Sequence, residues 1–114
     1  MKTYKLTANS LGILLLLSGC SATTQLADGA QAVQIVSEKP QNCKRLGEVE
    51  GYKYNLGPTL SLKEIQNSAK NDLKNNASAL GANVVEIIST DTIKADMSNK
   101  PREYHIQGIA YKCE

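Results

Sequence analysis

The chain has 114 residues, of which 13 are lysine or arginine and 11 are aspartate or glutamate, so its formal net charge is +2. A chain of this length forms one domain at most, and its near-balanced charge argues against a nucleic-acid partner, which would require a basic face. It contains no tryptophan and no phenylalanine. A small core without these side chains is marginally stable and would gain from a cross-link.

The N-terminus has the pattern of an export signal. Lys2 and Lys5 precede an apolar run over residues 11–17, which is far shorter than the roughly 20 residues that a membrane-spanning helix needs. A positive start, a short apolar core and small residues after it predict a signal peptide over residues 1–19. The exit sequence LSGC, residues 17–20, resembles a bacterial lipobox.

This resemblance implies that Cys20 becomes the first residue of the mature protein. Its sulfur would carry a diacylglyceryl group and its amine a third acyl chain, and several chains anchor stably where one chain holds only marginally. The alternative is an ordinary signal peptide with an unlipidated Cys20. Ser21 follows, where an Asp often signals retention of bacterial lipoproteins in the inner membrane, so the resemblance implies the periplasmic face of the outer membrane.

Residues 20–32 are small and polar without periodicity, and we expect a lipidated cysteine followed by a flexible tether. Such a tether spans at most about 40 Å when extended. The compact domain is expected over 33–114. If Cys20 carries lipid, then Cys43 and Cys113 remain as a pair in an oxidising compartment.

Two segments before the middle of the chain are strand-like. Residues 33–36 alternate weakly between apolar and polar, and residues 43–54 have the sequence CKRLGEVEGYKY. In the second segment Leu46 and Val49 are out of phase for strict alternation. The glycines at positions 47 and 51 therefore indicate a bulge or a place where a helix comes close.

The clearest element is a helix over residues 62–80. Ser61 and Glu64 form a capping-box pattern, in which each side chain accepts a hydrogen bond from the other residue's backbone N–H. Gly81 stands where a left-handed C-terminal cap is expected. Apolar residues recur at steps of three and four, as on one face of a helix: Leu62, Ile65, Ala69, Leu73, Ala77 and Leu80.

Two further strands are expected. Residues 84–88 are apolar on both faces apart from Glu86, which is typical of a central strand, and residues 104–113 alternate after a polar loop over 92–102. The strands that flank the helix should run parallel, and the last strand antiparallel to them. We therefore predict an α+β fold, a small mixed sheet of about four strands with one amphipathic helix packed on it.

This topology brings Cys43 and Cys113 to the same end of the sheet, as a disulfide requires. The disulfide would close a loop of about 70 residues and stabilise the domain by roughly 4 kcal/mol. A metal site of Cys43, His105, Cys113 and Glu114 is the alternative, although the closely spaced C-x-x-C pair of most such sites is absent.

Two motifs add a resemblance to a known family. LGEVEG, residues 46–51, and NDLKNNASALGANVV, residues 71–85, together with the lipobox and the flanking cysteines resemble a group of small Gram-negative outer-membrane lipoproteins of unknown function. That group is itself similar to the C-terminal domain of the Rcs envelope-stress sensor lipoprotein. The resemblance implies a small sheet with one helix, an outer-membrane location and a Cys43–Cys113 disulfide.

The chain departs from the Rcs sensor in two respects. The sensor domain has two disulfides, whereas residues 33–114 hold cysteines for one. The sensor also has a long proline-rich linker, whereas the segment 21–32 is short and contains no proline. The resemblance therefore implies the fold and the location, but no partner-binding residues.

Little in the sequence indicates catalysis, and we expect no enzyme and no cofactor beyond the lipid on Cys20. His105 is the one histidine, and no G-x-S-x-G nucleophile motif accompanies it. Glu48 and Glu50 share a strand face, as paired catalytic carboxylates would, but exposed glutamates on an edge strand also discourage aggregation.

Tyr52 and Tyr54 share the face of Glu48 and Glu50, and tyrosine is an adaptable contact residue at interfaces. These four residues are the candidate partner surface, with plain strand propensity as the alternative explanation. The expected function is a membrane-anchored interaction module that binds envelope proteins, with envelope-stress sensing or signalling as its setting. The alternative is a passive structural or assembly accessory of the envelope.

Overall fold

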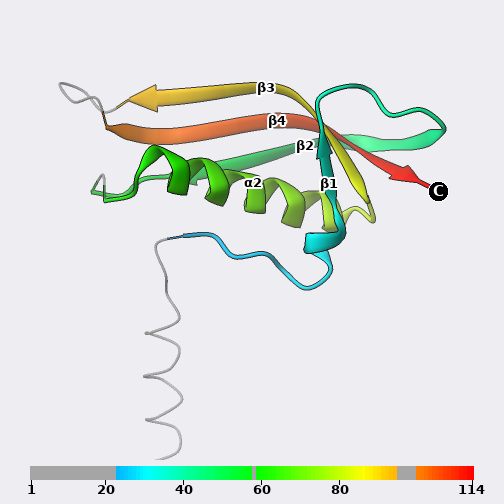
Figure 1. The fold of residues 1–114 in the computed structure, drawn as a ribbon, viewed down its shortest axis with the longest axis horizontal. Coiled ribbons are helices and arrows are strands. Elements are labelled where there is room, and N and C mark those ends of the chain that lie inside the picture. Colours follow the sequence, from blue (N-terminus) through cyan, green and yellow to red (C-terminus); the bar gives the residue numbers. More distant parts are fainter. Residues whose placement is uncertain (1–22, 58, 95–99) are drawn as a thin grey trace, which may run out of the picture.

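The computed structural model describes residues 23–57, 59–94 and 100–114, so the predicted signal peptide (1–19), Cys20 and Ser21 lie outside the described residues. The strands form one sheet in the order β1-β3-β4-β2, and the helix covers one of its faces (Figure 1). This arrangement confirms the predicted α+β class. In chain order the elements are η1 (Ala30–Ala32), β1 (Gln34–Val36), β2 (Cys43–Tyr54), α2 (Leu62–Ala79), β3 (Val84–Lys94) and β4 (Pro101–Cys113).

The strand directions follow the expected topology. β1 runs parallel to β3, while β2 and β3 both run antiparallel to β4, which lies between them. The strands that flank α2 therefore point the same way, as predicted. The predicted loop over 92–102 was too long, because β3 continues to Lys94 and Thr92 pairs with Tyr104. Threonine favours strands even where neither face is deeply buried.

Helix α2 has the predicted caps. The Ser61 hydroxyl accepts from the Glu64 N–H at 3.2 Å, and the Glu64 carboxylate accepts from the Ser61 N–H at 3.0 Å. Gly81 follows the helix with a φ of 85°, a left-handed conformation that glycine adopts without strain. The buried stripe packs on β2 and β4 through Ile65, Ala69, Leu73 and Ala77.

A bulge explains the irregular pattern of β2. The register with β4 shifts by one residue between Arg45 and Gly47, so that Leu46 has no partner of its own. The extra residue lets Leu46 and Val49 both pack against the core, although they are three positions apart. The prediction that position 47 marks a bulge is confirmed.

Gly51 lets the helix come close to β2. A Cβ atom built at this position would lie 2.6 Å from the Cβ of Leu73, and it would also collide with the backbone of α2. At this separation helix side chains reach the outer edge of the strand: Asp72 accepts from the Tyr52 N–H at 2.9 Å, and Asn76 donates to the Glu50 carbonyl at 2.7 Å. These bonds occupy backbone groups that an edge strand otherwise leaves open.

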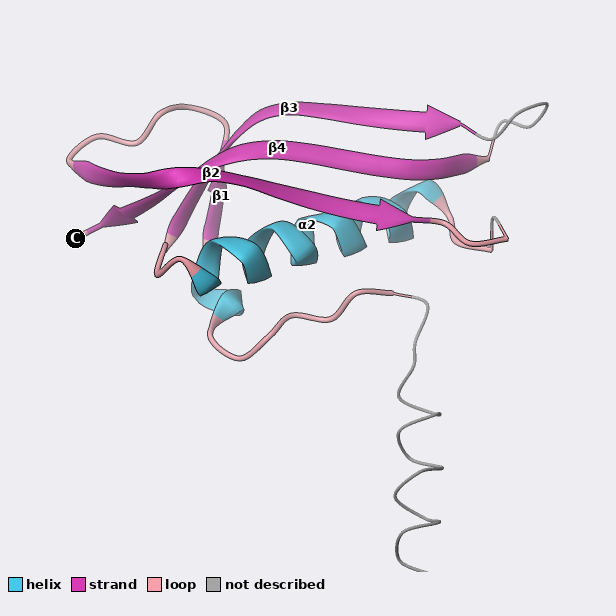
Figure 2. Cartoon of the chain, turned by 180° about the vertical axis from the view of Figure 1, so that it is seen from behind, coloured by secondary structure: helices cyan, strands magenta, loops and turns pink. Residues whose placement is uncertain are grey.

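The segment expected to be a flexible tether is instead bound to the helix from Thr24 onward. It runs along α2 on the side away from the sheet (Figures 1 and 2). Asn71 donates to the Thr24 carbonyl at 2.9 Å, and Asn75 donates to the Gln25 carbonyl at 2.9 Å and accepts from the Ala27 N–H at 2.7 Å. This contact was not predicted, because the segment has no periodicity of its own and its partners are polar helix residues.

Replacing Asn71 and Asn75 by alanine together should release this segment. The double variant loses three hydrogen bonds, so the Ala27 amide should exchange with solvent much faster and the free energy of unfolding should fall by about 1–3 kcal/mol. Hydrogen exchange measured by NMR checks this. Asn67→Ala, at an exposed position of the same helix, is the matched control. Equal Ala27 protection in the double variant and the control would contradict the bound segment.

The Cys43–Cys113 disulfide joins β2 to β4. The two cysteines are directly opposite in the register. Asn83 holds the same end of β4, because its side chain donates to the Cys113 carbonyl at 2.7 Å and accepts from the Cys113 N–H at 2.8 Å. The disulfide thus closes the end of the sheet at which β2 begins.

Removing the disulfide in a Cys43→Ser, Cys113→Ser double variant should lower the free energy of unfolding by about 4 kcal/mol, because the unfolded chain regains the entropy of a long loop. Urea denaturation of the double variant beside the oxidised protein measures the difference. An unchanged midpoint would show that the cross-link adds nothing to stability.

Candidate partner-binding face

The face of the sheet opposite α2 carries no helix or further strand among the described residues, although Tyr111 and Val84 at its disulfide end are buried. We call it the open face. Figures 1 and 2 show the helix and the N-terminal segment on the other side of the sheet. The side chains of the open face come from three strands: Glu48, Glu50, Tyr52 and Tyr54 of β2, Glu103, His105, Gln107 and Ile109 of β4, and Glu86, Ser89, Asp91 and Ile93 of β3.

The structure brings the four predicted surface residues to this face. Glu48 and Glu50 are exposed, and Tyr52 and Tyr54 expose 40% and 44% of their surface. Ile88 on β3 is 55% exposed and lies at the bulge where the β3–β4 register shifts. Exposed tyrosine and isoleucine side chains on one sheet face form the kind of surface that partners cover.

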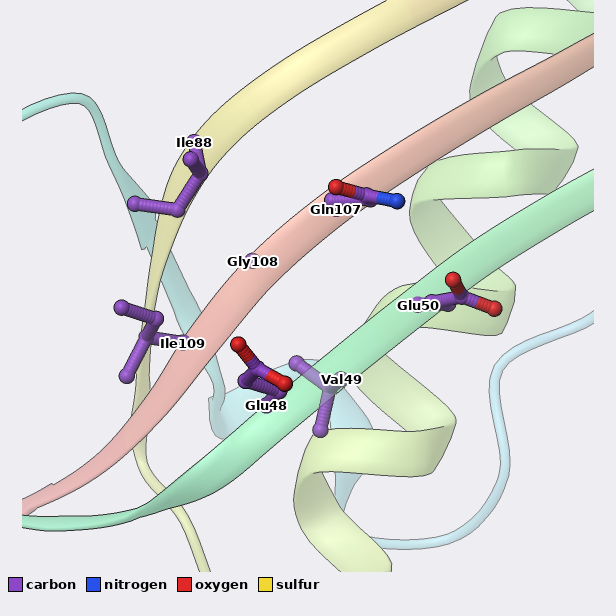
Figure 3. Close-up of a pocket in the computed structure, with 7 residues that line it drawn as sticks. All are labelled: Glu48, Val49, Glu50, Ile88, Gln107, Gly108 and Ile109. Carbon is purple, nitrogen blue, oxygen red and sulfur yellow. The ribbon is translucent and has the colours of Figure 1, made fainter.

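A shallow hollow of about 200 Å³ lies between β2 and β3 on this face. Figure 3 shows Glu48 and Glu50 on one side of it and Ile88 on the other, with Gln107 and Ile109 from β4 between them. Gly108 lies at the floor of the hollow, and its Cα faces the covered side of the sheet, where an added Cβ would lie 2.8 Å from the core residue Val85. The hollow combines apolar walls with carboxylates, so it suits an apolar side chain with a nearby positive charge.

A polar network orders the part of the face beyond the hollow. The Tyr52 hydroxyl donates to Glu103 at 3.1 Å, and His105 lies 3.3 Å from the same carboxylate oxygen. The rings of Tyr52 and His105 are in contact, with centroids 4.5 Å apart. Arg102 forms an ion pair with the second oxygen of Glu103 at 3.4 Å. The network fixes the orientation of Tyr52, so a partner meets a pre-positioned ring.

The network shifts the ionisation of two of its members. Partial burial and the hydrogen bond to Glu103 raise the pKa of Tyr52. Partial burial opposes ionisation of Glu103, but the hydrogen bonds with Tyr52 and His105 and the charge of Arg102 outweigh it and lower the pKa of Glu103. Both shifts favour an ionised Glu103 that accepts from a neutral Tyr52 at neutral pH.

The Tyr52→Phe variant should raise the pKa of Glu103 toward its usual value, because one of the hydrogen bonds to the carboxylate is lost. In the native protein the lowered pKa means that Glu103 stabilises the fold above its usual pKa, and this contribution is lost as the pH falls through the folded-state pKa. NMR titration of the Glu103 carboxyl carbon measures both effects. The same pKa in both proteins would contradict the network.

The open face is acidic, and the lysines gather elsewhere. Its described acidic residues are Glu48, Glu50, Glu86, Asp91 and Glu103. Three lysines lie on α2, and three more lie around a hollow at the disulfide end: Lys39, Lys44 and Lys112. Arg45 lies on the same face at the disulfide end and Arg102 pairs with Glu103, so the excess of acidic side chains over these two cations favours a partner with a positive surface.

The described residues offer few groups for the alternative metal site or for a catalytic role of His105. The disulfide takes up both thiols that the metal alternative would use. In the described ranges, no three histidine, cysteine, aspartate or glutamate side chains are placed to hold a metal ion. No helix within these ranges is long and apolar enough to cross a membrane. His105 contacts Glu103 and Tyr52, and among the described residues no hydrogen bond joins its ring to a serine hydroxyl or a cysteine thiol.

The fold and the open face define a small α+β domain with one covered and one exposed sheet face. Comparison with known families gives the group to which it belongs. Residues 24–113 match a domain of unknown function, DUF4156, and the chain belongs to this family. It is 35% identical over 112 residues to the uncharacterized protein YjeI of Escherichia coli strain K12, with 96% of each chain covered. The YjeI proteins of Escherichia coli O6:H1 and Shigella flexneri match to the same extent.

Several residues of this face were not predicted from the sequence. Glu103, Ile88, Gln107 and Ile109 were not singled out, and His105 was considered only as a metal ligand or catalytic base. The signal that would find them is the β2–β4 register, in which Tyr52 lies opposite His105 and Glu50 lies opposite Gln107.

Proposed function

We propose that this protein is a lipid-anchored interaction module of the cell envelope, whose open face binds another envelope protein. The observation that carries the proposal is the open face itself, where the hydrogen-bonded Tyr52 and the exposed Tyr54 follow a hollow lined by apolar and acidic side chains. Partly exposed tyrosine side chains beside an apolar hollow are typical of surfaces that bind other proteins.

The lipobox pattern at residues 17–20 supports attachment through Cys20. The bound N-terminal segment then determines which side of the domain faces the membrane. Only Ser21 and Ala22 separate Cys20 from the described segment, so the acylated residue lies within about 10–11 Å of Thr23. Since the segment runs along the back of α2, we propose that the helix side lies near the membrane and that the open face points away from it.

The motifs LGEVEG and ALGANVV support a relation to the C-terminal domain of the Rcs sensor lipoprotein. We therefore propose envelope-stress signalling as the setting in which the partner is to be found, at the periplasmic face of the outer membrane. The bound segment offers little free chain for threading through a barrel, which favours a periplasmic partner over surface display.

Site-specific photo-crosslinking in intact cells tests this proposal. A photoreactive side chain at Tyr54 or Glu50 should give one protein adduct, whereas the same group at Lys70, which is exposed on α2, should not give that adduct. A Tyr54→Ala substitution should lower the yield of the adduct formed from position 50 about tenfold, as expected for loss of an aromatic contact at an interface.

Mass spectrometry of the N-terminal peptide tests the anchor separately. The mature peptide should begin at Cys20 with three acyl chains, and Cys20→Ser should abolish both cleavage at this site and acylation. Equal adducts from the open face and from Lys70, or none from either, would contradict an interaction role for this face. An unmodified Cys20 would contradict the anchor alone.

A further inference from the structure

The two edges of the sheet differ in whether their outward backbone groups have partners. Along β2, the helix residues Asp72 and Asn76 occupy backbone groups that face outward. Along β3, the strand β1 pairs with Val84, Val85 and Glu86 and then ends. From Ile87 to Lys94, β3 has β4 on one side and no neighbouring strand on the other among the described residues. Figures 1 and 2 both show this part of β3 at the free border of the sheet.

The pairing pattern identifies the backbone groups at this edge. The N–H of Tyr52 points to the helix, so the alternate residues Gly51 and Lys53 bond to β4, opposite Ile106 and Tyr104. The neighbouring β4 residues therefore turn toward β3, where His105 pairs with Asp91. Because backbone direction alternates along a strand, the N–H and carbonyl groups of Thr90 and Thr92 point outward.

We infer that this edge of β3 binds an extended segment of a partner protein, which adds a strand to the sheet. The inference rests on the proposed interaction role and names the geometry of contact. Main-chain hydrogen bonds supply the affinity in this binding mode, and alternate side chains supply the specificity. Residues 89–92 of β3 suit this binding mode, because Thr90 and Thr92 are β-branched and Ser89 through Thr92 are all exposed.

The charges near this edge of β3 indicate which kind of partner segment it binds. Asp91 stands at the centre of the edge on the open face, where it lines a second hollow together with Ser89 and Ile93. In an antiparallel pair of two copies centred on this residue, Asp91 would face its own copy, and like charges directly opposite are destabilising. The rest of the open face is also acidic. The partner segment is therefore one with lysine or arginine at alternate positions, so that a positive charge meets Asp91.

A synthetic peptide tests this inference on the folded protein. The probe is a capped octapeptide in which lysine alternates with threonine, and its control has glutamate in place of lysine. The lysine peptide should bind with a dissociation constant of about 1 mM or tighter, and it should protect the Thr90 and Thr92 amides from exchange in NMR spectra. The glutamate peptide should bind at least about tenfold more weakly.

Two variants locate the contact. Thr90→Pro removes one outward N–H and keeps the bonds to β4, so it should weaken the lysine peptide about tenfold, while Thr90→Val should not. Asp91→Lys should reverse the preference between the two peptides, and it keeps the test decisive if the proline variant folds poorly. No protection by either peptide, unchanged preference in Asp91→Lys, or a dimer formed through this edge in sedimentation would overturn the inference. Open-face adducts that survive these variants would leave the proposed function standing.

Discussion

One helix packed on a four-stranded sheet is the constraint from which the rest of this structure follows. A single helix covers a single face, and here it is held close by Gly51 and buried through a stripe of alanine, leucine and isoleucine. The opposite face must then remain in water or meet a partner. With few large apolar side chains available, the protein adds a disulfide at one end and a bound N-terminal segment behind the helix.

The polar residues of the motif over 71–85 build the fold. Asn71 and Asn75 hold the N-terminal segment, Asp72 and Asn76 hold the edge of β2, and Asn83 holds the end of β4. One polar flank of the helix therefore binds the N-terminal segment, and the other binds the edge of β2. The motif thus explains how the covered side is assembled, whereas the residues available for contact lie on the open face and at the free edge of β3.

The helix, its caps, the strand directions and the disulfide could be predicted from the sequence, because each rests on a local pattern or on the parity of strand directions. The polar network could not. Counting from the opposed Cys43 and Cys113 without a bulge, Tyr52 would face Tyr104, and the bulge at Leu46 moves it to His105. A one-residue shift changes every cross-strand pair beyond it. The bulge was predicted from the sequence, but the residue pairs that result from it were not. The contact between the N-terminal segment and α2 left no periodic signal in either sequence.

The central claim is that the N-terminal segment turns the helix toward the membrane and the open face away from it. Relaxation of a nitroxide side chain by a paramagnetic ion on the lipid headgroups measures this in vesicles carrying the lipidated protein. One label belongs at Asn67, exposed on the helix, and the other at Glu48, exposed on the open face. The account predicts markedly faster relaxation at Asn67. Equal relaxation at the two positions, or faster relaxation at Glu48, would contradict it.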